Sequence, residues 1–227
     1  MRKNIAEIEN VMKNAYLLNQ NLQAESNADR KDKDMALSIA RDVHEIKKDY
    51  QNVISGLGDY FSDSNDANMQ LADILKVVIG YVRETIKNKH QDILIEVHNQ
   101  VDLVVPSHYY LVSIISNLLF NSVDALKDRS NGLIRLTVAD DLKNIIISIH
   151  DNGIGMDAET QSRIFQPGFT TKFDENTGDV YRGIGLSHVR IIVEEQFGGK
   201  ISVQSIPNKG TTFQVILNKQ RLTQREE

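Results

Sequence analysis

One loop constrains this 227-residue chain more than any other feature. Residues 151–156 follow an apolar run at residues 145–149, begin with Asp151 and contain Gly153 and Gly155. Glycines with this spacing let the backbone approach a flat ligand closely, and the carboxylate can accept a hydrogen bond from a ligand amino group. Such a run by itself is more often a plain turn. The blocks on both sides of the loop favour a binding site.

Three further blocks flank the loop in a fixed order. Upstream, Asn117 and Asn121 are four residues apart in a helical pattern and therefore share one helix face. Downstream, residues 165–172 contain two phenylalanines and end in two threonines and a lysine. Residues 182–187 then carry two glycines at the start of a new helical pattern.

In this order the four blocks resemble the N, G1, F and G2 boxes of an ATP-binding domain. Histidine kinases share that domain with gyrase, MutL and the heat-shock chaperones. The resemblance covers residues 71–217 and implies the Bergerat ATP-binding fold, a two-layer α/β sandwich. Apolar residues at helical spacing predict a buried stripe at residues 71–86, with capping residues for this helix at 62–66. Strands are predicted at residues 93–97, 103–105, 133–138, 145–149, 200–204 and 211–217.

The resemblance implies a site for ATP and Mg²⁺. Asp151 would accept the adenine amino group, and Asn121 would bind Mg²⁺ through its amide oxygen. Residues 173–181 form a polar loop suited to a lid over the nucleotide. The other implied ATP contacts are Asn117, Gly153, Gly155, Thr170, Thr171, Lys172, Gly183, Gly185 and Leu186.

Asn117 discriminates between branches of the resembled superfamily. In its ATPases and serine kinases, the position four residues before the magnesium-binding asparagine holds a glutamate that activates the nucleophile. Asn117 is an amide, which cannot accept a proton at neutral pH. The resemblance therefore implies a domain that binds ATP but hydrolyses it poorly.

The N-terminal part of the chain has helical patterns. Residues 4–23 carry one apolar stripe, and residues 39–60 carry a heptad seam. The polar stretch at residues 25–34 predicts a turn between two helices; alternatively, the first helix continues through it as one long coiled coil. Two such helices cannot bury their stripes alone, so we expect a homodimeric four-helix bundle.

His44 occupies an outward position of the second helical pattern and is followed by Glu45. Residues 40–45 resemble the phosphoacceptor box of sensor histidine kinases. The resemblance implies that His44 is the phosphorylated residue and Glu45 its acid–base partner. The chain departs from the common box, which has Asn or Thr and then Pro where Lys48 and Asp49 stand, and this departure bears on any phosphatase activity.

Composition limits the partners. The net charge of -5 argues against a nucleic-acid surface, and the absence of cysteine excludes disulfides and thiolate metal sites. No apolar run approaches the roughly 20 residues of a spanning helix. We therefore expect a cytoplasmic chain without membrane contact, and any membrane sensor would lie outside it.

These expectations describe an α+β protein with a helical dimerisation and phosphotransfer region at residues 1–65, an ATP-binding domain at 66–219 and a charged tail at 220–227. The resemblance implies a protein histidine kinase that phosphorylates His44 and passes the phosphoryl group to an aspartate of a response-regulator receiver domain. Two alternatives stay open. One is an ATPase or serine kinase on the same fold, and the other is a non-catalytic dimeric scaffold that binds nucleotide only as a ligand.

Overall fold

The computed structural model describes residues 68–171, 183 and 185–224, which form a helix-backed sheet. The N-terminal region, for which helices and a dimeric bundle are predicted, lies outside these residues. In chain order the elements are β1 (Met69–Gln70), α3 (Leu71–Asn88), β2 (Ile93–Asn99), β3 (Val104–Val105), α4 (His108–Ala125), β4 (Gly132–Asp140), β5 (Asn144–Asp151), α5 (Ala158–Arg163), α6 (Gly185–Ile191), the π-helix η1 (Ile192–Gln196), β6 (Lys200–Ile206), β7 (Gly210–Asn218) and α7 (Lys219–Thr223).

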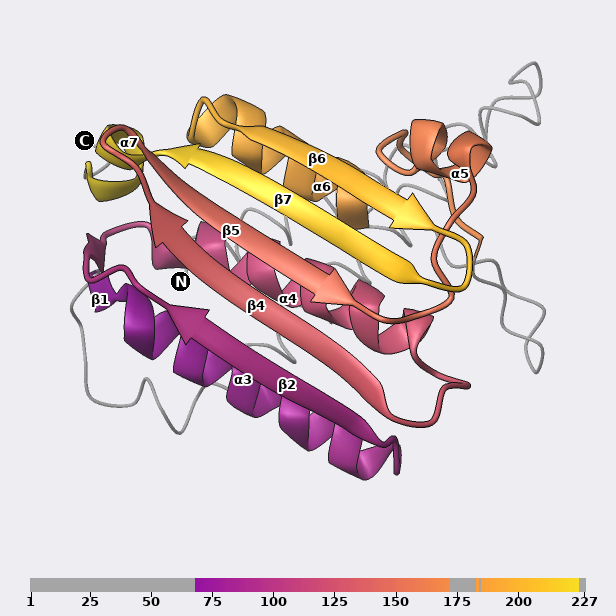
Figure 1. Cartoon of the computed structure of the whole chain (residues 1–227). Coiled ribbons are helices and arrows are strands. Elements are labelled where there is room, and N and C mark those ends of the chain that lie inside the picture. The colour runs from indigo at the N-terminus through magenta and orange to yellow at the C-terminus, as the bar shows by residue number, and fades with distance from the viewer. Residues whose placement is uncertain (1–67, 172–182, 184, 225–227) are drawn as a thin grey trace, which may run out of the picture. The chain divides into compact units, whose positions relative to one another are not determined.

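Five strands form one mixed sheet in the order β2-β4-β5-β7-β6, with β2 parallel to β4 and the other pairs antiparallel. Helices α3, α4 and α6 lie behind one face of this sheet (Figure 1). The predicted two-layer α/β sandwich is therefore confirmed for the described residues. Asp151 at the end of β5 pairs in register with Ile134 on one side and Thr211 on the other. These pairings bring three strand ends together at one end of the sheet.

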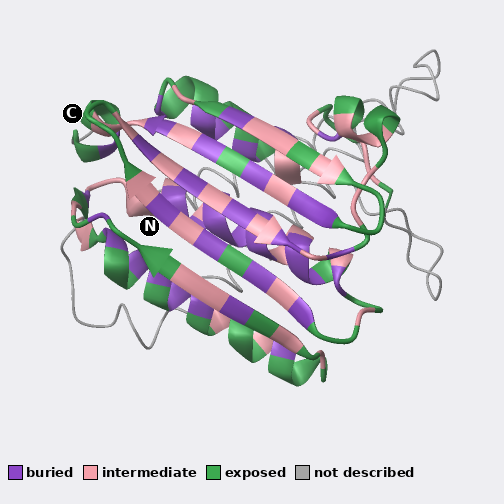
Figure 2. Cartoon of the chain, viewed as in Figure 1, coloured by how far each residue is buried: buried purple, intermediate pink, exposed green. Residues whose placement is uncertain are grey.

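Alternation along the strands explains which face is covered. Every second residue of β4, β5 and β7 is buried toward the helices, and the alternation is visible along these strands in Figure 2. Helix α3 supplies a stripe of eight buried apolar residues, which agrees with the helical spacing seen in the sequence. The fully buried residues Ile134, Leu136, Ile145, Ile147, Leu118 and Leu119 are among those that form the core between the layers.

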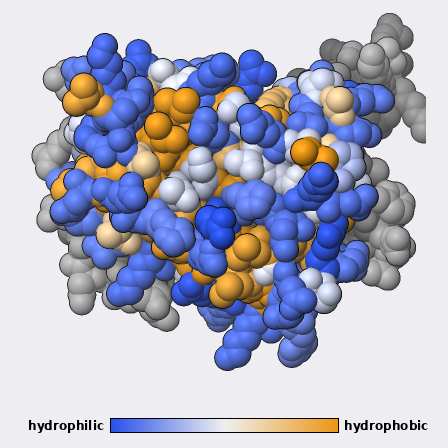
Figure 3. Space-filling model, in the orientation of Figure 1, coloured by the Kyte–Doolittle hydropathy of each residue, from blue (hydrophilic) through white to orange (hydrophobic). Residues whose placement is uncertain are grey.

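The opposite face of the sheet carries mainly polar side chains. Figure 3 shows it as largely hydrophilic, with separate hydrophobic groups among the polar ones. A transverse row on this face contains the ion pair between Arg135 Nε and Glu96 Oε2 (2.8 Å). In the same row His150 Nδ1 lies 2.9 Å from Thr212 Oγ1. A polar outer face of this kind is typical of a sheet of mostly antiparallel strands that packs on helices with one face and contacts solvent with the other.

The start of the domain confirms one expectation and contradicts another. The strand predicted at residues 103–105 is present as β3, and its Val104 and Val105 pair with Gln70 and Met69 in a two-stranded sheet that is separate from the main sheet. Helix α3 is not capped by residues 62–66, where the sequence predicted its capping residues. It begins at Leu71, whose N–H donates to Leu103 O (2.9 Å), and its N-cap residue Gln70 makes no side-chain capping bond.

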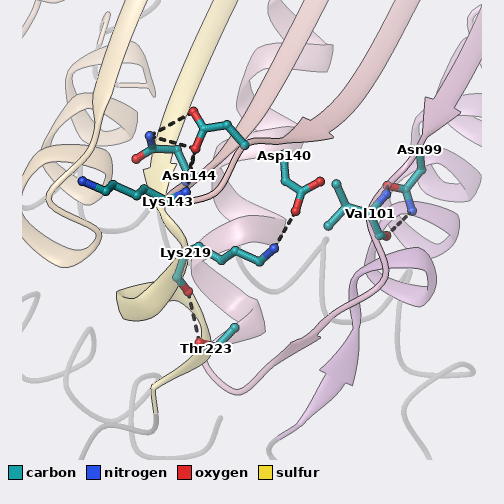
Figure 4. Close-up of polar contacts among 8 residues, drawn as sticks. Asn99, Val101, Asp140, Lys143, Asn144, Lys219 and Thr223 are labelled. Atoms are coloured by element: carbon teal, nitrogen blue, oxygen red, sulfur yellow. Dashed lines mark hydrogen bonds and ion pairs between the residues drawn. The ribbon is translucent and has the colours of Figure 1, made fainter.

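Residues at the start of the predicted charged tail form the short helix α7. Asn218 caps this helix by accepting from the backbone N–H of Arg221 (3.1 Å), and Lys219 Nζ binds Asp140 Oδ2 at the start of the β4–β5 turn (Figure 4). Leu222 is only 1% exposed. Charged neighbours mask this single apolar residue in the sequence, and its burial holds the segment in place.

Candidate nucleotide-binding site

Asp151 lies at the centre of the candidate site and is 1% exposed. Its Oδ1 accepts the backbone N–H of Gly153 (2.9 Å), and its Oδ2 accepts the hydroxyl of Ser122 on α4 (3.1 Å). Burial raises the pKa of Asp151, while the donors on Gly153, Ser122 and the Thr211 backbone act in the opposite direction. The carboxylate is therefore held by fixed donors and keeps lone pairs for a ligand amino group.

The two glycines of the loop allow its backbone to pack closely. A Cβ at Gly153 would lie 2.7 Å from Ala125 O, at the end of α4. Gly155 has a φ of 64°, and a Cβ there would lie 2.1 Å from Ile206 O. The loop therefore passes between the end of α4 and the end of β6 at distances that only glycine permits.

Asn117 and Asn121 lie one turn apart on α4, and both are half-buried. Asn117 Nδ2 donates to Ser113 O (2.8 Å), so Oδ1 is the atom left to face α6. A Cβ at Gly185, the first residue of α6, would lie 2.7 Å from this Oδ1. The structure thus brings the predicted asparagine and glycine blocks together, with Leu186 half-buried in the first turn of α6.

The phenylalanine block follows α5 and contacts both the sheet and the glycine block. Phe165 packs edge-on against Phe213 of β7, with ring centroids 6.5 Å apart. Phe169 lies under the guanidinium of Arg163, 4.6 Å from the ring centroid. Gly183 has a φ of 61°, and a Cβ there would lie 2.0 Å from Phe169 O. The phenylalanine and second glycine blocks are therefore adjacent.

Several predicted residues remain untested by this geometry. Thr170 and Thr171 end the described segment, and Lys172 and the expected lid at residues 173–181 lie outside it. His44 and Glu45 also lie outside the described residues, as do Lys48 and Asp49. Their roles stay predictions.

Sequence reasoning missed polar residues that hold the site together. Ser122 and Thr211 contact or adjoin Asp151, and both are buried. Asn152 joins the loop to β4, because its Oδ1 accepts the N–H of Leu133 (2.7 Å). Thr211 has a signal in the sequence: it occupies an inward position of β7 among apolar residues, where a polar side chain needs a partner. Ser122 has no such signal, since its partner lies 29 residues away.

The residues present suit Mg²⁺ bound together with a nucleotide. Asn121 offers an amide oxygen, a ligand type that Mg²⁺ accepts. Among the described residues there is no group of three or more His, Asp or Glu side chains able to hold a metal. A magnesium ion at Asn121 would therefore take most of its ligands from phosphate oxygens and water.

No helix in residues 68–171 or 185–224 is both long and apolar enough to cross a membrane.

Comparison with known protein families gives one match. Residues 108–221 match the family described as histidine kinase-, DNA gyrase B-, and HSP90-like ATPases. The matched range contains the asparagine, acid–glycine, phenylalanine and second glycine blocks.

Similar curated proteins are sensor kinases. The chain is 29% identical to the sensor histidine kinase GlnK of Bacillus subtilis (strain 168), covering 99% of this chain and 53% of GlnK. It is 37% identical to the signal transduction histidine-protein kinase AtoS of Escherichia coli (strain K12), covering 56% of this chain and 19% of AtoS. The chain therefore spans about half the length of GlnK and less of AtoS.

Solved structures agree with the fold. The catalytic domain of the histidine kinase ThkA superposes with a TM-score of 0.56 at 25% identity, covering 67% of this chain and 96% of that domain. ThkA in complex with the response regulator TrrA gives a TM-score of 0.55 at 20% identity over 98% of this chain and 62% of that one, which supports the fold alone.

Proposed function

Since the chain belongs to the family of histidine kinase-, DNA gyrase B-, and HSP90-like ATPases, we propose that it is an ATP-dependent protein histidine kinase of a two-component system. The observation that supports this most is that the site combines a buried carboxyl group, at Asp151, with an amide at Asn117. The first supplies an acceptor for adenine. The second leaves the site without a base at that position, so the γ-phosphate is kept for a nucleophile elsewhere in the chain.

In the proposed reaction the described residues bind and orient ATP. Asp151 would accept the adenine amino group, the absence of a side chain at Gly185 lets the start of α6 approach Asn117 closely, and Asn121 would hold Mg²⁺. The metal would neutralise charge on the transferring phosphoryl group. These contacts fix the γ-phosphate for in-line attack, which contributes through positioning rather than acid–base chemistry in this domain.

His44 would be the nucleophile. One imidazole nitrogen attacks the γ-phosphorus, the bond to the bridging oxygen breaks, and ADP leaves with that electron pair. Glu45 takes the proton from the other ring nitrogen, so the product is a neutral phosphorylated imidazole. A carboxylate of a response-regulator receiver domain would then accept the phosphoryl group. ThkA has been solved with a response regulator, which supports a partner of this class, and the heptad seam supports a homodimer.

The proposal is tested by incubating the chain with γ-labelled ATP and Mg²⁺. We expect label that is lost in acid and retained in alkali, and we expect His44→Gln to remove it without changing ATP affinity. His98→Gln is the matched control, because His98 is exposed on β2 and lies outside the candidate site. Label retained in His44→Gln would contradict the assignment of the phosphorylated residue.

The same experiment separates the alternatives. Rapid steady-state release of phosphate without protein labelling would favour an ATPase, and acid-stable label would favour a serine kinase. ATP binding with neither label nor turnover would favour the non-catalytic scaffold.

A further inference from the structure

Gln161, on the short helix α5, makes more side-chain hydrogen bonds than its exposed neighbours on this helix. Its Oε1 accepts the backbone N–H of Ser205 (3.0 Å), and its Nε2 donates to Ser205 O (3.0 Å). Nε2 also donates to Met156 O (3.1 Å). The amide therefore pairs with both backbone groups of Ser205, as a neighbouring strand would, and adds a bond to the loop that follows Gly155.

Ser205 continues this network toward the acid at the centre of the site. Its hydroxyl accepts the N–H of Met156 (2.8 Å) and lies 2.9 Å from Thr211 Oγ1. Thr211 pairs with Asp151 across the sheet, and both residues are buried. Both backbone groups of Met156 are thus fixed, one by Ser205 and one by Gln161.

The other end of α5 leads directly into the loop at residues 165–171. Arg163, two residues after Gln161, stacks on Phe169 at 4.6 Å, and Phe165 packs on Phe213 at 6.5 Å. The backbone of Phe169 in turn touches that of Gly183. The position of α5 therefore determines where this loop stands relative to the glycines before α6.

We propose that Gln161 is a positioning residue for the phosphate end of the ATP site. It joins α5 to the end of β6, and through α5 it places residues 165–171 at the correct distance from the pocket around Asp151. This inference rests on the proposed function, since it concerns the same nucleotide. The adenine end has its own donors on Ser122 and Gly153, and neither belongs to α5. Loss of Gln161 also removes a bond to Met156, but the donors to Asp151 remain, so phosphate recognition should be affected more than adenine recognition.

The test compares the affinities of the full chain for ATP and for adenosine, which carries the base and ribose but no phosphate. For Gln161→Ala we expect ATP affinity to fall about 5- to 10-fold and adenosine affinity to stay within about 2-fold. Gln161→Glu keeps the acceptor for the Ser205 N–H and loses the three donated bonds, which go to the backbone oxygens of Met156, Asp157 and Ser205, so it should show the same selectivity. Ser205→Ala, which removes the contacts to Met156 and Thr211, should weaken both ligands.

Ser162→Ala is the matched control on the same helix, because its exposed hydroxyl bonds only to Glu159 O among the described contacts (2.7 Å). We expect it to bind both ligands like the unmodified chain. Equal loss of ATP and adenosine in both Gln161 variants, or no loss in either, would overturn the inference. Failure of the unmodified chain to bind ATP would instead overturn the proposed function.

Discussion

At the scale of single residues, the buried carboxyl group of Asp151 has a cost in stability that its proposed role in binding would explain. Burial raises its pKa above the ordinary 3.8, so the ionised carboxylate is less favourable in the folded chain than in the unfolded chain. Below pH 3.8 both states are protonated and this cost is absent; it develops as the pH rises through the folded pKa. The ionised form that costs stability is the form that best accepts an amino group.

Asp151→Asn should therefore separate the two effects. We expect ATP affinity to fall roughly 10- to 100-fold, because a charged acceptor is lost. At pH 7 the melting temperature of the ligand-free variant should be at least as high as that of the parent. Any difference between the two melting temperatures should shrink as the pH falls toward about 4. Titration calorimetry and thermal unfolding measure these quantities. Asp157→Asn, an exposed helix cap in the same loop, should bind ATP normally; equal loss in both variants would contradict a specific role for Asp151.

At the scale of elements, the loop after β5 depends on a left-handed residue. Gly155→Ala should destabilise the domain by at least about 1–2 kcal/mol, from the left-handed conformation alone, with a further cost from the contact with Ile206 O. Gly80 is the control: it lies in α3 with nothing within 4 Å of an added Cβ. Gly80→Ala should stabilise by about 0.5–1 kcal/mol. Urea unfolding measures the change in the free energy of unfolding for each variant. A change of the same sign in both variants would refute the interpretation.

At the scale of the whole domain, α7 closes the end of the sheet opposite the site. Leu222→Ala should cost about 2–3 kcal/mol, the lower part of the range for a buried leucine, because a short helix at the surface can collapse toward the gap. Leu142→Ala provides the comparison, since Leu142 is fully exposed on the β4–β5 turn and should change stability by less than about 0.5 kcal/mol. Equal unfolding midpoints would mean that α7 does not contribute to the domain's stability.

The sequence predicted what depends on periodicity and on local loop chemistry. The alternation in β5 and β7 and the stripe of α3 defined their faces, and the acid–glycine block defined the centre of the site. The contacts from Ser122 and Gln161 could not be predicted, because their partners lie 29 and 44 residues away and follow no period. Strand β1, the partner of the predicted strand β3, was missed because two residues are too few to show a period.

That small sheet has a mechanical consequence. The chain enters the described domain through β1, which is held by two residue pairs and followed at once by the fully buried Leu71. Tension applied to the chain ahead of Met69 would first separate this ladder, releasing about 7 Å of backbone. Leu71 would then bear the load through its packing in the core. A force-extension trace should therefore begin with a short, reversible step at low force, well before the five-stranded sheet ruptures.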